Sequence, residues 1–178
     1  MLMLTIESAK DFATARRRAL LERWLNILAH RPKDLLSFDM VKRTLQLQDS
    51  AYRGLHEIEL QKIIGSVGKH RHFSRYFYPK NDRDELRWRR VDELFHRHGF
   101  EPIEVYQVDD AYFVRDGHHR VSVNRTHNVP TIEAYVTEYK SPLPVNKNDD
   151  LKSLIFKMRR AASGTLAKKR APATLTIV

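Results

Sequence analysis

The chain has 178 residues and a formal net charge of +10, from 32 Lys and Arg against 22 Asp and Glu. It has no Cys, which excludes disulfides, zinc–thiolate sites and cysteine nucleophiles. No apolar run reaches the ~18 residues that a membrane span needs. The first residues lack the charged-then-apolar pattern of a secretory signal, so we expect a soluble cytoplasmic protein without a membrane partner.

The positive charge is concentrated near the C-terminus. Nine of the Lys and Arg residues but only two Asp lie in 140–178, which gives this segment a net charge of +7 and leaves the first 139 residues at +3. A basic tail attracts polyanions without sequence specificity. Nucleic acid is therefore a candidate partner of the tail, although a solvated extension without a partner has the same composition.

Residues 1–50 predict a helical N-terminal region. Apolar residues recur at helical spacing over 5–30, where Ser8 and Asp11 form a capping pair. The spacing predicts one apolar face made of Phe12, Ala15, Ala19, Leu20, Trp24, Ile27 and Leu28. A second helix is expected to begin at Ser37, a residue type that caps helix N-termini.

Residues 51–139 predict an α+β domain. A helix is expected over 82–98, where Trp88 falls on the apolar face and Gly99 ends the helix. Apolar and polar residues alternate, as in strands, at 56–60, 102–108, 111–115 and 131–136. Strand, helix, hairpin, helix and strand follow one another, which favours a small mixed sheet with flanking helices.

Residues 140–178 predict a basic linker, a short helix and a tail. Pro142 and Pro144 mark the linker, and the run Lys168-Lys169-Arg170 lies in the expected tail. The helix is expected over 149–162. One of its faces carries Leu151, Leu154, Ile155 and Met158.

The run Asp116-Gly117-His118-His119-Arg120 is the strongest functional signal in the chain. It lies between a predicted strand and a short predicted helix, and a Gly at that point lets an anion approach the N–H groups of the first helical turn. Arg120 can make a bidentate contact with a phosphate, and both imidazoles can donate hydrogen bonds to it. Gly117, His118, His119 and Arg120 are therefore candidate phosphate-binding residues.

The segment from Ile63 to His70 offers weaker support for an anion site. Its glycines are too closely spaced for a P-loop, and His70 occupies the place of the hydroxyl residue, so we exclude a Walker A site. Gly68, Lys69 and His70 stay candidates for a supporting turn with exposed amides.

The roles of three residues in the turn stay open. Asp116 can hold Mg²⁺ beside a nucleotide, act as a catalytic base, or cap the following helix. His118 and His119 can be phosphate donors, metal ligands or ordinary polar residues. Adjacent side chains diverge by about 100° on a helix, which disfavours joint ligation of one metal ion. We expect no metal site formed by the protein alone.

The segment 99–105, the hairpin after it and the turn at 117–120 resemble the N-terminal domain of ParB and its sulfiredoxin-fold relatives. In that family a G…P-I-x-V strand, which here contains Pro102, precedes a G-x-x-R turn that holds the phosphates of a nucleotide. The resemblance covers residues 56–139 and implies ATP, ADP or CTP, with Mg²⁺, as the ligand.

Several features depart from that family. The absence of Cys removes the sulfinic-acid chemistry of sulfiredoxin, and His118 stands where the ParB turn normally carries Glu. The spacing from Gly99 to Pro102 is one residue shorter than usual, and 140–178 has no clear counterpart of ParB's helix-turn-helix and dimerisation regions. The resemblance therefore implies a phosphate-binding turn rather than a complete ParB.

The leading hypothesis is a ParB-like nucleotide- or phosphate-binding domain in an accessory or regulatory protein associated with DNA. One alternative is an enzyme of the same fold, either a small-molecule kinase-like phosphotransferase that uses Asp116 or a nuclease. Another is a protein–protein interaction module that docks partners through its amphipathic helices. The sequence does not specify the oligomeric state.

Overall fold

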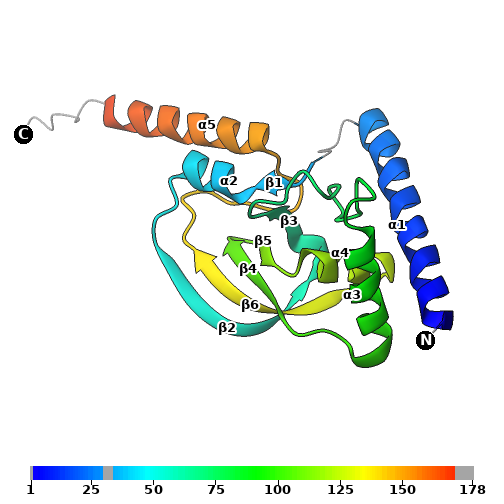
Figure 1. Cartoon of the computed structure of the whole chain (residues 1–178). Helices are drawn as coiled ribbons and strands as arrows, with labels where there is room; N and C mark the ends of the chain where they lie inside the picture. The colour runs from blue at the N-terminus through cyan, green and yellow to red at the C-terminus, as the bar shows by residue number, and fades with distance from the viewer. Residues whose placement is uncertain (1, 30–33, 171–178) are drawn as a thin grey trace, which may run out of the picture.

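The computed structural model describes residues 2–29 and 34–170 of the chain (Figure 1). These residues form a mixed sheet with helices on both of its faces. The helices are α1 (Leu2–Leu28), α2 (Phe38–Leu45), α3 (Glu85–His98), α4 (His118–Thr126) and α5 (Leu151–Arg170), with a short 3-10 helix at Leu60–Lys62. The strands are β1 (Leu36–Ser37), β2 (Ser50–Glu59), β3 (Ile63–Ser66), β4 (Ile103–Val108), β5 (Ala111–Asp116) and β6 (Thr131–Tyr139).

The sheet order is β1-β3-β5-β4-β6-β2. The β1–β3, β3–β5 and β4–β6 pairs are parallel, whereas β4–β5 and β2–β6 are antiparallel. The hairpin between β4 and β5 turns at Asp109 and Asp110, as the sequence predicts, and Asp109 adopts a positive φ of 53°. The predicted α+β class, with a mixed sheet and flanking helices, is confirmed.

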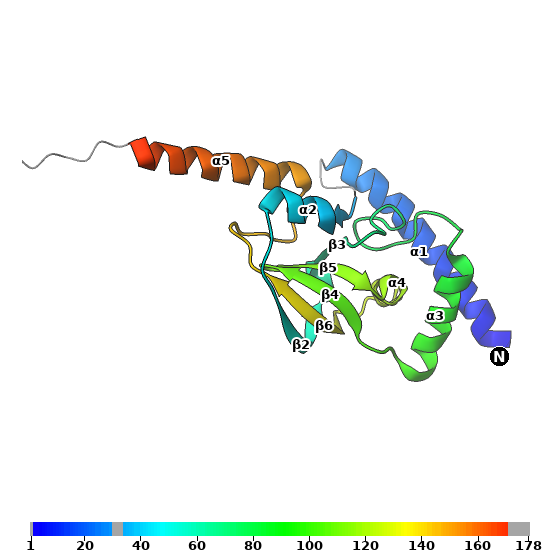
Figure 2. The same ribbon diagram turned by 60° about the vertical axis from the view of Figure 1, so that its left-hand side comes forward.

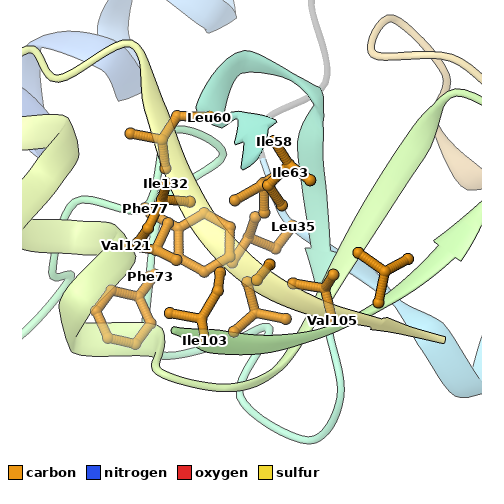
Figure 3. Packing of buried hydrophobic residues seen from close by; sticks show 13 residues of the cluster. Leu35, Ile58, Leu60, Ile63, Phe73, Phe77, Ile103, Val105, Val121 and Ile132 are labelled. Atoms are coloured by element: carbon orange, nitrogen blue, oxygen red, sulfur yellow. The ribbon is translucent and has the colours of Figure 1, made fainter. Parts of the chain in front are cut away.

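Side chains from the two faces of the sheet form two separate apolar clusters. Neighbouring residues of one strand point to opposite faces, so Ile63 and Val114 join one cluster while Ile64 and Phe113 join the other. The first cluster includes Val121 of α4 and two Phe residues of the segment between β3 and α3 (Figure 3). The second is covered by α2 and α5 (Figure 2). The helix that carries the predicted phosphate turn therefore lies on the first face.

Helix α3 confirms the helix predicted over 82–98, including its end before Gly99, although it begins three residues later, at Glu85. Trp88 is completely buried, and its indole Nε1–H donates a hydrogen bond of 2.8 Å to Ser122 Oγ on α4. Phe12 of α1 packs edge-on against the indole, with a ring-centroid separation of 5.6 Å. Trp88 thus joins α1, α3 and α4 into one layer.

Helix α1 differs from the prediction in two ways. It begins at Leu2, so Ser8 lies inside the helix, where its hydroxyl bonds to the carbonyl of Thr5 instead of capping the N-terminus. Phe12, Ala15 and Ala19 are buried as predicted, but other members of the apolar face are exposed: Leu20 (53%), Trp24 (66%), Ile27 (41%) and Leu28 (76%). The reason is that α1 buries one face along its length, which carries Phe12, Ala15, Ala19, Glu22 and Asn26, whereas the exposed side chains lie off that face.

The C-terminal part of α1 is held by a buried polar contact. The Glu22 carboxylate accepts hydrogen bonds from the hydroxyl of Ser74, from the backbone N–H of Tyr76 and from the amide of Asn26. Burial raises the pKa of Glu22, and these donors oppose the rise. Glu22 thus fastens α1 to the segment that precedes α3.

Replacing Glu22 should separate hydrogen bonding from charge. Glu22→Ala leaves several buried donors without an acceptor and is expected to cost about 1–3 kcal/mol of unfolding free energy. Glu22→Gln keeps the shape and can accept or donate the same bonds without a buried charge, so its stability at neutral pH should stay within about 1 kcal/mol of wild type. Urea denaturation of both variants measures the difference, and equal losses would contradict this account.

Helix α5 extends beyond the helix predicted over 149–162. The buried Leu154 packs it onto the second cluster, as the predicted apolar face requires. The helix continues to Arg170, so the basic run Lys168–Arg170 is helical rather than part of a separate tail. Ala, Leu, Lys and Arg dominate this part of the chain and favour helix, which outweighs the single Gly164. Residues 171–178 lie outside the described residues.

None of the described helices combines the length and the apolar character needed to cross a membrane.

Candidate functional site

The predicted phosphate turn lies where β3 and β5 end. The two strands are parallel neighbours, so their carboxyl ends share one edge of the sheet, and Ser66 pairs in register with Val114. The chain leaves β5 through Gly117 and enters α4 at His118. It leaves β3 through the segment that contains Gly68 and Lys69. The pairing of β3 with β5 therefore brings the two predicted anion-binding segments side by side.

One hydrogen-bond chain joins these segments. Ser66 Oγ lies 2.7 Å from Nε2 of His118, and the backbone N–H of Lys69 donates to the same hydroxyl oxygen at 3.1 Å. Because that hydroxyl already accepts from Lys69, its own proton can be donated to a neutral His118. Ser66 is completely buried, so it orients His118 and is not itself accessible to a substrate.

Gly117 sets the direction of the turn. Its φ of 91° lies in the left-handed region, and its carbonyl accepts the backbone N–H of Val121. A Cβ at this position would lie 2.4 Å from Cγ2 of Ile103 in β4, so the turn lies directly on the sheet. The N–H groups of residues 118–120 belong to the first helical turn, which has no intrahelical acceptors.

His118 and His119 are both 5% exposed. Burial lowers the pKa of each imidazole from 6.5 to about 4, and the positive charge of Lys69 contributes to both shifts. Neither ring nitrogen of His119 has a hydrogen-bond partner, although the ring packs edge-on against Phe73 at 5.4 Å. Buried imidazole nitrogens normally have partners, so His119 has an unmet capacity to bond a ligand.

Further charged groups surround the two imidazoles. His72 Nδ1 lies 3.1 Å from Asp84 Oδ2, and the positive charge of Arg87 acts on His119. Burial alone would raise the pKa of Asp84, but the hydrogen bond from His72 and nearby positive charges lower it. The site is therefore basic in character, with Asp84 as an anionic neighbour.

Arg120 is engaged by the protein itself. Its Nη1 donates to the carbonyls of Glu101 and Pro102, both at 2.8 Å, and its Nη2 donates to Asp116 Oδ2 at 2.7 Å. Two of the five guanidinium N–H groups thus bond to the segment before β4, and a third bonds to Asp116 at the end of β5. Pro102 takes part through this carbonyl. The Asp116 carboxylate is 63% exposed and pairs with Arg120, without capping α4.

The supporting residues lie in different environments. Gly68 is exposed with a φ of 80° and open space around it, whereas His70 is half-buried and its Nδ1 has no hydrogen-bond partner. The backbone of Lys69 bonds to Ser66, and its ammonium group contributes charge near both imidazoles. The roles of all these residues stay predictions.

Comparisons with known proteins give one structural similarity. No family model and no curated protein matches the chain. Among solved structures, sulfiredoxin from Arabidopsis thaliana is similar, with 21% sequence identity, a TM-score of 0.39, and coverage of 49% of this chain and 89% of that chain.

Sequence reasoning missed two residues of the site. Ser66 and Asp84 come from the end of β3 and from the segment between β3 and α3, neither of which carries a recognised phosphate motif. A usable signal was the β-branched pair Ile63-Ile64, which is typical of an interior parallel strand, and the structure buries the whole run to Ser66. Pairing that run with β5 would have placed Ser66 beside His118.

Proposed function

We propose that the turn at 117–119 and the segment 66–72 together bind a phosphate group, most simply that of a nucleotide such as ATP, ADP or CTP with Mg²⁺. The observation that carries this proposal is the unpartnered, buried imidazole of His119 at the N-terminus of α4. A phosphate oxygen there would accept a hydrogen bond that the protein leaves unmade.

Electrostatics support an anion rather than a cation. The N-terminus of a helix carries a partial positive charge, and Lys69 and Arg87 add full charges near the imidazoles. Because both imidazoles are neutral at pH 7, each has one N–H to donate. The two rings therefore do not place two positive charges side by side in a buried site. Binding of an anion would favour their protonation and tighten the contact at lower pH.

The proposed role of Arg120 is altered by its geometry. Its bonds to Glu101, Pro102 and Asp116 favour a positioning role that fixes the turn, with two N–H groups left for a phosphate. His119 and Lys69 then become the main ligand contacts.

A catalytic role is a second step of the same proposal. The exposed Asp116 carboxylate lies one residue before the turn, where it can hold Mg²⁺ or accept a proton from an acceptor hydroxyl. A phosphotransferase would lose turnover in Asp116→Asn while it kept nucleotide binding. A domain that only binds would show no turnover in either protein.

Two surfaces suggest partners for such a domain. The basic helix α5 projects from the body beyond α2, which favours contact with nucleic acid (Figure 2). The exposed Leu20, Trp24 and Leu28 on α1 favour a protein partner instead. We propose the first, as an accessory protein near DNA, because the excess charge lies in that part of the chain.

His119→Leu is expected to weaken binding of ATP, ADP, CTP or inorganic phosphate by about tenfold or more, because a hydrogen bond to a charged group contributes about 1.5–3 kcal/mol. Leu is close to His in volume, so the packing against Phe73 is largely kept. Isothermal titration of each ligand, with and without Mg²⁺, measures the change.

The matched control is His56→Leu, which removes an exposed imidazole from β2 and should bind like wild type. Lys69→Ala should weaken binding as well, and more strongly at low salt than at high salt. If wild type binds none of these ligands, or if His119→Leu binds them equally well, the proposed site is wrong.

A further inference from the structure

A second cluster of ionisable side chains lies at the other end of α4. It consists of Asp11 on α1, Asp92 and His96 on α3, and His127, which follows α4. One carboxylate oxygen or imidazole nitrogen from each of the four lies within 4.8 Å of the others. Three separate elements of the fold thus direct oxygen and nitrogen ligands to one point.

The distances within the cluster suit a small cation. His127 Nε2 lies 2.7 Å from Asp92 Oδ1, and His96 Nε2 lies 3.7 Å from Asp11 Oδ2 and 3.9 Å from Asp92 Oδ2. Ligand atoms around a tetrahedral zinc ion, with bonds of about 2.0 Å, are about 3.3 Å apart. Side-chain rotations that shorten the separations of up to 4.8 Å and lengthen the 2.7 Å contact would bring the four ligand atoms to that arrangement.

Asp92 provides an independent observation. Its side chain is completely buried, and its Oδ2 atom has no hydrogen-bond partner. A buried carboxylate oxygen without a donor is costly, because burial removes the water that would otherwise bond to it. A cation between the four side chains would satisfy that oxygen, whereas the hydrogen bond from His127 reaches only Oδ1.

The surrounding residues hold the four ligands in place. Asp92 and His96 are one helical turn apart on α3 and therefore share a face. The ring of Phe95 stacks on the His127 imidazole, with centroids 4.6 Å apart and an angle of 10° between the planes. Asp11 precedes Phe12, whose contact with Trp88 fixes this part of α1.

We propose that Asp11, Asp92, His96 and His127 bind one divalent transition-metal ion, with zinc as the best match. Two imidazoles and two carboxylates are the ligand types that zinc accepts, and softer thiolate ligands are absent. Four protein ligands leave no open position, which is typical of a structural site. The ion would fasten α1 to α3 and to the end of α4, apart from the phosphate site at the start of α4.

Zinc titration of the metal-free 178-residue chain tests the proposal. Calorimetry is expected to show saturable binding of one zinc ion per chain, and thermal unfolding should shift to higher temperature in its presence. His96→Ala removes the most exposed ligand of the four and should weaken zinc binding by about tenfold or more. Its metal-free melting temperature should stay close to that of wild type.

Asp92→Asn is the second variant, because it keeps the volume and a hydrogen bond to His127 but loses the anionic ligand. It should also lose the thermal shift by zinc, whereas His56→Ala, which removes a distant exposed imidazole, should keep it. If wild type shows no saturable one-to-one binding, or if His96→Ala and Asp92→Asn bind zinc as tightly as wild type, the cluster is a hydrogen-bond network and not a metal site.

Discussion

Acidification from pH 6.5 to pH 4 is expected to remove several kcal/mol of the unfolding free energy of this protein. Burial lowers the pKa of His118 and His119 from 6.5 to about 4 in the folded state. In this interval the unfolded chain binds protons at both imidazoles and the folded chain does not, so stability falls as the pH falls. The loss is complete below pH 4 and amounts to about 3 kcal/mol for each imidazole.

The contribution of one imidazole is measured by difference. Urea denaturation at a series of pH values between 4 and 7 gives the unfolding free energy at each pH. This free energy should fall less steeply with decreasing pH for His119→Leu than for wild type, because one of the two titrating groups is gone. Glu22 acts in the opposite direction: burial raises its pKa above 4.5, so acidification through that range favours the folded state. Glu22 is present in both proteins, and its effect cancels in the comparison.

His56→Leu again serves as the control, because it removes an exposed imidazole. Its unfolding free energy should depend on pH as that of wild type does. A His119→Leu slope as steep as that of wild type would show that burial at the turn does not govern the acid response. Added phosphate should flatten the wild-type slope if the proposed anion site is correct, since the bound anion would favour protonated imidazoles.

Local sequence patterns predicted the central part of the fold. Alternation over 102–108 and 111–115, with two Asp between them, specified the β4–β5 hairpin, and Trp88 with Gly99 specified α3 and its end. These signals succeed because each depends on residues a few positions apart. The apolar face predicted for α1 was too broad, because 100° per residue places Trp24 about 120° and Leu28 about 160° from Phe12, and both side chains are exposed.

Contacts between distant segments of the candidate site could not be predicted from local patterns. The residues Gly117, His118, His119 and Arg120 could be chosen from a strand–Gly–helix pattern, which is local. The contact of Ser66 with His118 depends on the parallel pairing of β3 with β5, which joins residues 52 positions apart. That the Arg120 guanidinium bonds to backbone carbonyls before β4 is likewise a long-range fact, and it shifts the proposed phosphate contacts toward His119 and Lys69.

Gly117→Ala is expected to destabilise the protein by about 3 kcal/mol or more. A non-Gly residue in the left-handed region costs about 1–2 kcal/mol, and the added Cβ would lie 2.4 Å from Ile103 Cγ2 and 2.9 Å from Ile103 Cβ. Neither atom belongs to a flexible chain end, because Ile103 is completely buried in β4. Forcing extra volume into such packing adds about 1–3 kcal/mol.

Gly54→Ala is the matched control for backbone strain, since Gly54 has a φ of 87° and nothing within 4 Å of the Cβ position. It should cost only about 1 kcal/mol, so the difference between the two variants measures the contact with Ile103. In an Ile103→Ala background, Gly117→Ala should cost less than in wild type, because the obstructing Cγ2 atom is gone. Two results would contradict this account: equal losses of unfolding free energy in Gly117→Ala and Gly54→Ala, and additive losses in the double variant. The strain at Gly117 would then be purely local, and contact with β4 would not set the direction in which α4 presents its N-terminus.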